Sequence, residues 1–296
     1  MHIETLKTFC DLVDSGSFSQ AARMNFITQS AVSQQLQALE QRFGLELLDH
    51  SIRRRVVLTP AGRNLLEAAR EIIQIYAGLE DRLRAGDKSI AGEIRIATVY
   101  SVGLHELPPF LKSFLREHPQ VHVHLAYHRT NLVYEACLDN SIDFGIVALP
   151  QHRQNLEILP LKGDNLVLVC SPEHPLARRK RISVKRLAGA DFISFERDIP
   201  TRKQIDRILR ENETAVQIVM EFDNVETIKR SVEAGIGIAI LPDAVVTNEV
   251  RNGQLCRLDF TEGPFHRPVG IIYRKGKSFT QAARALMDLL TKSEEA

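Results

Sequence analysis

Residues 17–42 read SFSQAARMNFITQSAVSQQLQALEQR, a pattern that predicts two short helices joined by a tight turn. Thr28 is a suitable N-cap for the second helix, and Asn25 is suited to the turn before it. The small residues Ala21 and Ala22 would let a neighbouring helix approach the first helix closely. Four apolar residues recur at helical spacing and predict one buried stripe on the second helix, namely Val32, Leu36, Leu39 and Phe43.

The face of the second helix opposite this stripe is polar and almost uncharged. It carries Ser30, Ser33, Gln34, Gln37 and Gln41. Uncharged amides and hydroxyls suit the edges of bases in a major groove better than they suit phosphates. The pattern alone is equally typical of an ordinary amphipathic helix pair with a polar outer face, so both interpretations stay open at this point.

A basic segment follows the helix pair. After Gly44 the chain reads LELLDHSIRRRVVLTPAG, and residues 49–58 are expected to form a short hairpin, or wing. The wing would carry Arg53, Arg54 and Arg55 near its tip. Arginines at that place would contact the phosphates beside the groove that the helix occupies, which favours DNA binding over the alternative.

Residues 17–62 resemble the winged helix-turn-helix of the LysR-type transcriptional regulators, and the similarity extends over the first 63 residues. The resemblance places Gln29, Ser30, Ser33 and Gln34 where the family reads bases, and Arg54 on the wing. Ser30 stands where proline is common and Gln34 where arginine is common, which bears on the bases preferred and not on the mode of binding. The predicted DNA-binding residues are Thr28, Gln29, Ser30, Ser33, Gln34, Gln37, Arg53, Arg54 and Arg55.

The composition is that of a globular chain with room for more than one domain. Its 296 residues are 44% apolar and 25% charged, which is enough for two or three domains with buried cores. The net charge of +1 predicts modest non-specific DNA affinity that is quickly lost with salt. The N-terminus does not read as a signal peptide, and no apolar run is long enough to span a membrane. Because the four cysteines form no CxxC pair, we expect a reduced, cytoplasmic protein with no membrane partner.

Residues 59–86 are expected to form one long linker helix after the DNA-binding domain of residues 1–63. Thr59 would cap this helix, Pro60 would occupy its first position and Gly86 would end it. A heptad-like seam runs along it through Leu65, Ala69, Ile72, Tyr76, Leu79 and Leu83. This seam predicts a homodimer, because a helix-turn-helix protein generally reads two half-sites. The alternative is packing against the chain's own C-terminal domain, whereas the family resemblance implies a dimer, often assembled into a tetramer.

Beyond a linker near residues 85–92, segments typical of strands alternate with segments typical of helices. This alternation predicts mostly parallel sheets covered by helices. We expect an α/β effector domain over residues 93–296, with one lobe formed by 93–162 and 268–296 and the other by 163–267. The resemblance implies the same architecture, which is the two-lobed, cleft-bearing fold of periplasmic solute-binding proteins.

Polar side chains stand where several of the predicted strands end and helices begin. Ligands in open α/β sheets bind at this edge, where hydroxyl donors and helix N-termini suit an anion or a carboxylate. Taken singly, each Ser or Thr is more simply explained as a helix N-cap. Their convergence favours an effector site, which the resemblance also places here. The candidate effector-binding residues are Tyr100, Ser101, Arg129, Thr130, Thr201, Arg202 and, with weaker support, Asn224.

No catalytic motif and no metal-binding spacing stands out, so neither enzymatic activity nor a cofactor is expected. The sequence predicts a sequence-specific DNA-binding transcriptional regulator whose activity a small anionic effector modulates. Its expected partners are a double-stranded DNA operator, a carboxylate or inorganic anion, further copies of itself and RNA polymerase. The alternative from another class is a solute-binding or small-molecule enzyme domain in the C-terminal half.

Overall fold

The computed structural model describes residues 2–49, 56–84 and 90–292. The chain divides into two compact units, one built around residues 1–89 and the other around the residues from 90 onward. The wing arginines Arg53, Arg54 and Arg55, and the helix end expected at Gly86, lie outside the described residues. Among the residues described, no helix is long and apolar enough to cross a membrane.

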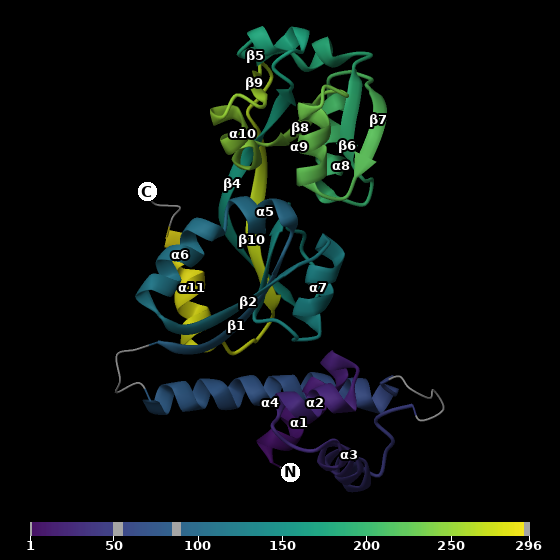
Figure 1. Ribbon diagram of the computed structural model, residues 1–296, viewed down its shortest axis with the longest axis vertical. Helices are drawn as coiled ribbons and strands as arrows, with labels where there is room; N and C mark the ends of the chain where they lie inside the picture. Colours follow the sequence, from purple (N-terminus) through teal and green to yellow (C-terminus); the bar gives the residue numbers. More distant parts are fainter. Residues whose placement is uncertain (1, 50–55, 85–89, 293–296) are drawn as a thin grey trace. The chain divides into compact units, whose positions relative to one another are not determined.

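The N-terminal unit consists of α1 (Ile3–Ser15), α2 (Phe18–Met24), α3 (Gln29–Phe43) and α4 (Pro60–Arg84), labelled in Figure 1. The predicted helix-turn-helix is confirmed as α2 and α3. The Asn25 amide stabilises the turn by donating to the Asp11 carboxylate over 2.8 Å. The Thr28 hydroxyl caps α3 by accepting from the Ala31 amide over 3.2 Å.

A small apolar core holds this unit together, and Ala21 and Ala22 lie inside it as expected. The buried stripe of α3 comprises Val32, Leu36 and Leu39. The prediction that Phe43 extends the stripe is wrong, since its side chain is 43% exposed. The cause is that α3 ends at Phe43, where Gly44 adopts a left-handed conformation and the chain leaves the core.

The chain after α3 forms the base of the predicted wing. Leu48 and Leu58 make an antiparallel bridge, so the two ends of the hairpin lie side by side. The Thr59 hydroxyl then caps α4 by accepting from the Gly62 amide over 3.0 Å. A Cβ atom at Gly62 would lie 2.0 Å from the Leu47 carbonyl oxygen, so this close approach requires glycine.

The linker helix α4 has two different parts. Its first turns pack on the core of the DNA-binding unit, where Ala69 is fully buried and Leu65 is half-buried. The prediction that Ala69 belongs to a dimer seam is therefore wrong, whereas the prediction for Leu65 stays a prediction. The other seam residues are exposed, namely Ile72, Tyr76, Leu79 and Leu83. The neighbouring Ile75 is exposed as well.

The C-terminal unit has the expected alternation of strands and helices. Its strands are β1 (Ala91–Thr98), β2 (Gln120–Tyr127), β3 (Phe144–Ala148), β4 (Leu156–Cys170), β5 (Arg181–Ile182), β6 (Asp191–Phe195), β7 (Gln217–Phe222), β8 (Ala239–Pro242), β9 (Cys256–Phe260) and β10 (Phe265–Arg274). Its helices are α5 (Tyr100–His105), α6 (Pro108–Glu117), α7 (Thr130–Leu138), α8 (Pro200–Glu211), α9 (Val225–Glu233), α10 (Thr247–Arg251) and α11 (Gln281–Lys292).

These elements form two lobes. In the first lobe, β1 pairs in parallel with β2 and β3, and β10 joins antiparallel to β3. Every residue of β3 is buried, as expected of a central strand. In the second lobe, the end of β4 pairs with β8 and β9, and β6 pairs in parallel with β7.

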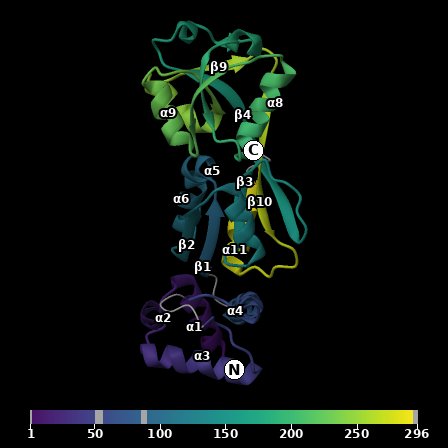
Figure 2. The ribbon, with the colours of Figure 1, turned by 90° about the vertical axis from the view of Figure 1, so that its right-hand side faces the viewer.

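Two long antiparallel strands connect the lobes. The pairing of β4 with β10 extends from Leu166 opposite Phe265 to Leu156 opposite Arg274, so both strands pass from one lobe to the other (Figure 2). The lobe boundaries predicted at 162/163 and 267/268 therefore fall inside continuous strands. The final strand and helix belong to the C-terminal unit with the first lobe, as the resemblance implied.

Candidate DNA-reading face and effector cleft

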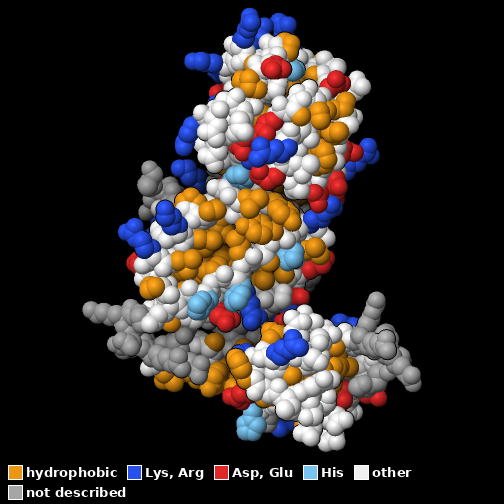
Figure 3. All heavy atoms as spheres, viewed as in Figure 1, with side chains coloured by type: hydrophobic (Ala, Val, Ile, Leu, Met, Phe, Trp, Pro, Cys, Tyr) orange, Lys and Arg blue, Asp and Glu red, His pale blue; other side chains and the backbone are white. Residues whose placement is uncertain are grey.

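The outward face of α3 is formed by the predicted polar side chains. Gln29, Ser30, Gln34 and Gln37 are exposed, and Ser33 is half-buried. The surface over α3 in Figure 3 is largely without charged side chains, consistent with an all-amide and hydroxyl set. Uncharged donors and acceptors on an exposed helix are the chemistry that base edges require.

Hydrogen bonds within the unit separate these residues into two groups. The Ser33 hydroxyl donates to the Gln29 carbonyl oxygen over 3.3 Å, and the Gln29 side-chain oxygen accepts from Ser19 over 3.1 Å. Thr28 is occupied as the N-cap. Gln34, by contrast, makes no side-chain hydrogen bond to another described residue, so its amide can donate to and accept from a base at once.

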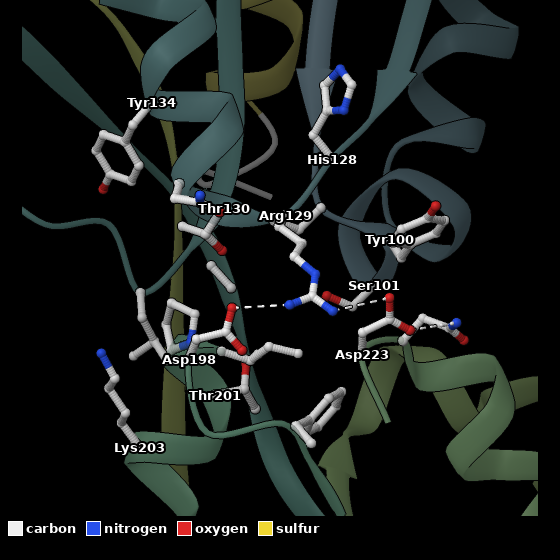
Figure 4. A pocket seen from close by; sticks show the side chains of 18 of the residues that line it. Tyr100, Ser101, His128, Arg129, Thr130, Tyr134, Asp198, Thr201, Lys203 and Asp223 are labelled. Carbon is white, nitrogen blue, oxygen red and sulfur yellow. Dashed lines mark hydrogen bonds and ion pairs between the residues drawn. The ribbon is translucent and has the colours of Figure 1, made fainter. Parts of the chain in front are cut away.

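A cavity of about 350 Å³ lies between the two lobes of the C-terminal unit, and Figure 4 shows the side chains that line it. The structure brings together six of the seven predicted effector-binding residues from four separate segments. They are Tyr100 and Ser101 on α5, Arg129 and Thr130 at the start of α7, Thr201 at the start of α8, and Asn224 before α9.

Arg202 does not belong to this cavity, so its prediction as an effector-binding residue is wrong. Its side chain is buried and donates to the Asp206 carboxylate over 2.8 Å, to the Phe195 carbonyl oxygen over 2.6 Å and to Glu221. Adjacent residues on a helix point about 100° apart. Because Thr201 faces the cavity, Arg202 is turned toward the body of its own lobe.

Arg129 extends from the first lobe to three carboxylates of the second. Its guanidinium lies 2.7 Å from Glu196, 3.2 Å from Asp198 and 3.4 Å from Asp223. Hydrogen bonding and attraction from Glu196 raise the pKa of Arg129, so it stays charged. With 41% of its side chain exposed, these ion pairs are in contact with solvent and exchangeable.

The cavity also contains residues that the sequence interpretation missed. The Tyr134 hydroxyl accepts from the Gln151 amide over 2.7 Å, and the Arg153 guanidinium lies 3.9 Å from the centre of the Tyr134 ring. Lys203 on α8 completes this side of the cavity. Gln151 and Arg153 follow β3 at its carboxyl end, so the rule applied to other strands would have found them.

A buried ion cluster supports the cavity from behind α5. Arg267 is fully buried and donates to the Ser101 hydroxyl over 3.1 Å, to Asp164 over 2.8 Å and to Glu106 over 2.9 Å. Burial raises the pKa of Glu106 from 4.5 to about 7. The Ser101 side chain, which lines the cavity, is therefore held in place by Arg267 of β10.

Comparison with known proteins gives consistent matches. Residues 3–63 match the family described as bacterial regulatory helix-turn-helix protein, lysR family, and residues 87–294 match the LysR substrate binding domain. The chain is 29% identical to the HTH-type transcriptional activator CmpR of Synechocystis, over 99% of this chain and 96% of that protein.

Solved structures show the same fold. Full-length OxyR from Pseudomonas aeruginosa superposes with a TM-score of 0.80 at 20% identity, over 99% of this chain and 94% of that one. The CcmR regulatory domain of Synechocystis, solved in complex with 2-PG, superposes with a TM-score of 0.63 at 24% identity. That match covers 68% of this chain and 97% of the CcmR chain.

Proposed function

This chain belongs to the LysR family of DNA-binding transcriptional regulators, and from that premise we propose how it reads its operator and what it senses. It carries the DNA-binding domain and the effector-binding domain of that family. The observation that supports the proposal most strongly is the cavity between the lobes, which collects predicted polar residues from four segments far apart in the sequence.

For DNA reading, α3 enters the major groove with its uncharged face toward the bases. Gln34 and Gln37 are exposed there and make no side-chain hydrogen bonds to other described residues, so both amides are available to base edges. Gln29, Ser30 and Ser33 lie beside them on the same helix. The wing arginines Arg53, Arg54 and Arg55 would then contact phosphates.

For assembly, two copies pair through the exposed half of α4. Ile72, Ile75, Tyr76, Leu79 and Leu83 form an apolar stripe on this helix that its own unit leaves uncovered. Pairing of two such stripes buries them and fixes the distance between two copies of α3. Further association into a tetramer and contact with RNA polymerase would follow at the operator.

For sensing, a small molecule with an anionic group binds in the cavity between the lobes. The start of α7 brings the positive end of a helix dipole to Thr130, and Arg153 and Lys203 add positive charge. A related fold is known in complex with a small molecule, the CcmR regulatory domain with 2-PG. A ligand that binds one arrangement of the lobes better than another shifts the population between them.

The DNA-binding half of this proposal is tested by selecting bound duplexes from random DNA with the full-length chain. We expect enrichment of a site with two half-sites, about one helical turn or a multiple of a turn apart. Recovery of sequences no different from the starting pool would contradict the proposal.

The sensing half is tested with Thr130→Ala and Thr201→Ala, which remove hydroxyls from opposite walls of the cavity. Both variants should bind the selected DNA as the native chain does and lose the change in DNA affinity that the effector causes. Ser113→Ala, on the exposed side of α6, is the matched control. A native response from both cavity variants would show that the effector binds elsewhere.

A further inference from the structure

Two of the four cysteines lie directly opposite each other in the second lobe. Cys170 is the last residue of β4 and Cys256 is the first residue of β9. The antiparallel pairing of these strands places Cys170 across from Cys256. Their side chains therefore project from the same face of the sheet, side by side. The other two cysteines are on helices, Cys10 on α1 and Cys137 on α7.

The position of this pair meets the geometric requirement of a disulfide. Residues directly opposite each other on antiparallel strands have Cα atoms about 4.5 to 5.5 Å apart. Disulfides join residues whose Cα atoms are about 4.4 to 6.8 Å apart. The register of β4 and β9 therefore brings the Cys170 and Cys256 sulfur atoms within reach of each other with little movement of the backbone.

The two thiols differ in their access to solvent. Cys170 is fully buried, and this burial raises the pKa of its thiol from 9.0 to about 11, with a further contribution from the nearby Cys256. Cys256 is only half-buried, so a small oxidant in solution can approach its side chain. Because the thiolate is the nucleophile and buried cysteines are inert toward dissolved reagents, oxidation of the pair must begin at Cys256.

We propose that Cys170 and Cys256 are a redox pair that hydrogen peroxide converts into a disulfide between β4 and β9. The Cys256 thiolate attacks one peroxide oxygen, so that an S–O bond forms, the O–O bond breaks and hydroxide leaves. The Cys170 sulfur then attacks the Cys256 sulfenic acid, the S–S bond forms, and the sulfenic oxygen leaves as water with the Cys170 proton. In sum, two thiols and one hydrogen peroxide give one disulfide and two water molecules, and two electrons pass from sulfur to oxygen.

The disulfide fastens the second-lobe end of a strand that both lobes share, because β4 passes from one lobe to the other and Cys170 is its last residue. Neither cysteine lines the cavity between the lobes, so the bond acts on the second lobe without occupying the effector site. Disulfides of proteins in reducing compartments are usually transient and redox-sensing. The pair is therefore reduced at rest, oxidised by an excess of peroxide and restored by a dithiol.

The inference is tested on the full-length chain, first reduced and then treated with a small excess of hydrogen peroxide. We expect the chain to lose two thiols and the mass of two hydrogen atoms, with no cross-link to a second chain on a non-reducing gel. Digestion with trypsin should then give one linked pair of peptides, residues 163–178 joined to residues 252–257. Dithiothreitol should restore both thiols and separate the two peptides.

Variants separate the roles of the two thiols. Cys170→Ala should leave Cys256 as a sulfenic acid that dimedone traps, whereas Cys256→Ser should leave the buried Cys170 unreacted in the folded chain. Cys137→Ala, which removes a buried thiol from α7 in the first lobe, is the matched control and should form the same disulfide as the native chain. Should a variant fail to fold, the peptide map of the native chain still decides.

Three results with the native chain would overturn the inference. They are recovery of the two peptides only in unlinked form, oxidation of Cys256 to the sulfinic acid while Cys170 stays a thiol, and linkage of Cys256 to a second chain in place of Cys170. The experiment uses neither DNA nor effector. Its failure would therefore remove this inference and leave the proposed function as it stands.

Discussion

The DNA-reading face and the effector cavity are held in place by different forces. Val32, Leu36 and Leu39 fix α3 from behind through close apolar packing, and Gly62 lets α4 approach the same core. The cavity walls, in contrast, meet through the exposed ion pairs of Arg129. A surface that reads bases needs a fixed geometry, whereas a site that responds to a ligand needs contacts that can be exchanged.

The largest effect expected from this difference is unfolding of the DNA-binding unit in the Gly62→Ala variant. A Cβ atom would lie 2.0 Å from the Leu47 carbonyl oxygen and 2.9 Å from a side-chain atom of Leu58. Because the Leu47 contact is with backbone, no side-chain rotation can relieve it. We expect a destabilisation of about 3 kcal/mol or more, seen as loss of the corresponding thermal transition and of DNA binding. Ligand binding by the other unit should persist.

Gly16→Ala is the control for that experiment. Gly16 has a φ of 62° with open space around its Cβ position, so the strain should be only about 1 kcal/mol. A Gly62→Ala protein that melts like the native chain would show that the packing at Leu47 is not tight.

The next effect concerns assembly. Leu79→Glu places a charge in the exposed stripe of α4, where Leu79 is 43% exposed in the single chain. We expect a monomer by light scattering and operator affinity lower by about 100-fold, because two linked half-site contacts become independent. Gln74→Glu adds the same charge on a different face of α4 and should stay dimeric. A Leu79→Glu dimer would refute the stripe as the interface.

The buried cluster behind the cavity predicts a pH dependence. The pKa of Glu106 is raised from 4.5 to about 7, so the folded protein keeps a proton that the unfolded chain releases between these values. The contribution of Glu106 to the free energy of unfolding is therefore lost as pH rises from about 4.5 to about 7, and it falls by on the order of 3 kcal/mol. Urea unfolding of Glu106→Gln should show a smaller loss between pH 5 and pH 8 than the native chain. An equal fall in the free energy of unfolding between pH 5 and pH 8 in the variant and in the native chain would refute this prediction.

The smallest effect is confined to one base pair. Gln34→Ala should relax the preference at one position of each half-site by about 1–3 kcal/mol and leave effector binding unchanged. Ser33→Ala should change the base preference less, because the Ser33 hydroxyl already donates to the Gln29 carbonyl oxygen. Selection from random DNA measures both, and an unchanged consensus with Gln34→Ala would remove that residue from the base-reading set.

The sequence predicted those features that depend on neighbours in the chain. The helix-turn-helix, its Thr28 cap and the Thr59 cap follow from local hydrogen bonding and helical spacing, and all three are present. The hydroxyls at strand ends were also found, because parallel strands bring their carboxyl ends to one edge.

Features that depend on distant segments were missed. Spacing cannot tell which of Thr201 and Arg202 faces the cavity, since Phe195 and Glu221 decide it. Spacing also does not show that the guanidinium of Arg129 contacts three carboxylates of the other lobe, those of Glu196, Asp198 and Asp223. Ala69 fitted the heptad spacing yet packs inside its own unit, because spacing marks an apolar face without saying what covers it.

The most direct test of the central claim, that α3 presents a base-reading face, is fluorescence anisotropy of the full-length chain on the selected duplex and on a scrambled duplex. The account predicts that the selected duplex binds about 1,000-fold more tightly, and that the difference remains as salt weakens binding to the scrambled one. Equal affinity for both duplexes at every salt concentration would contradict it.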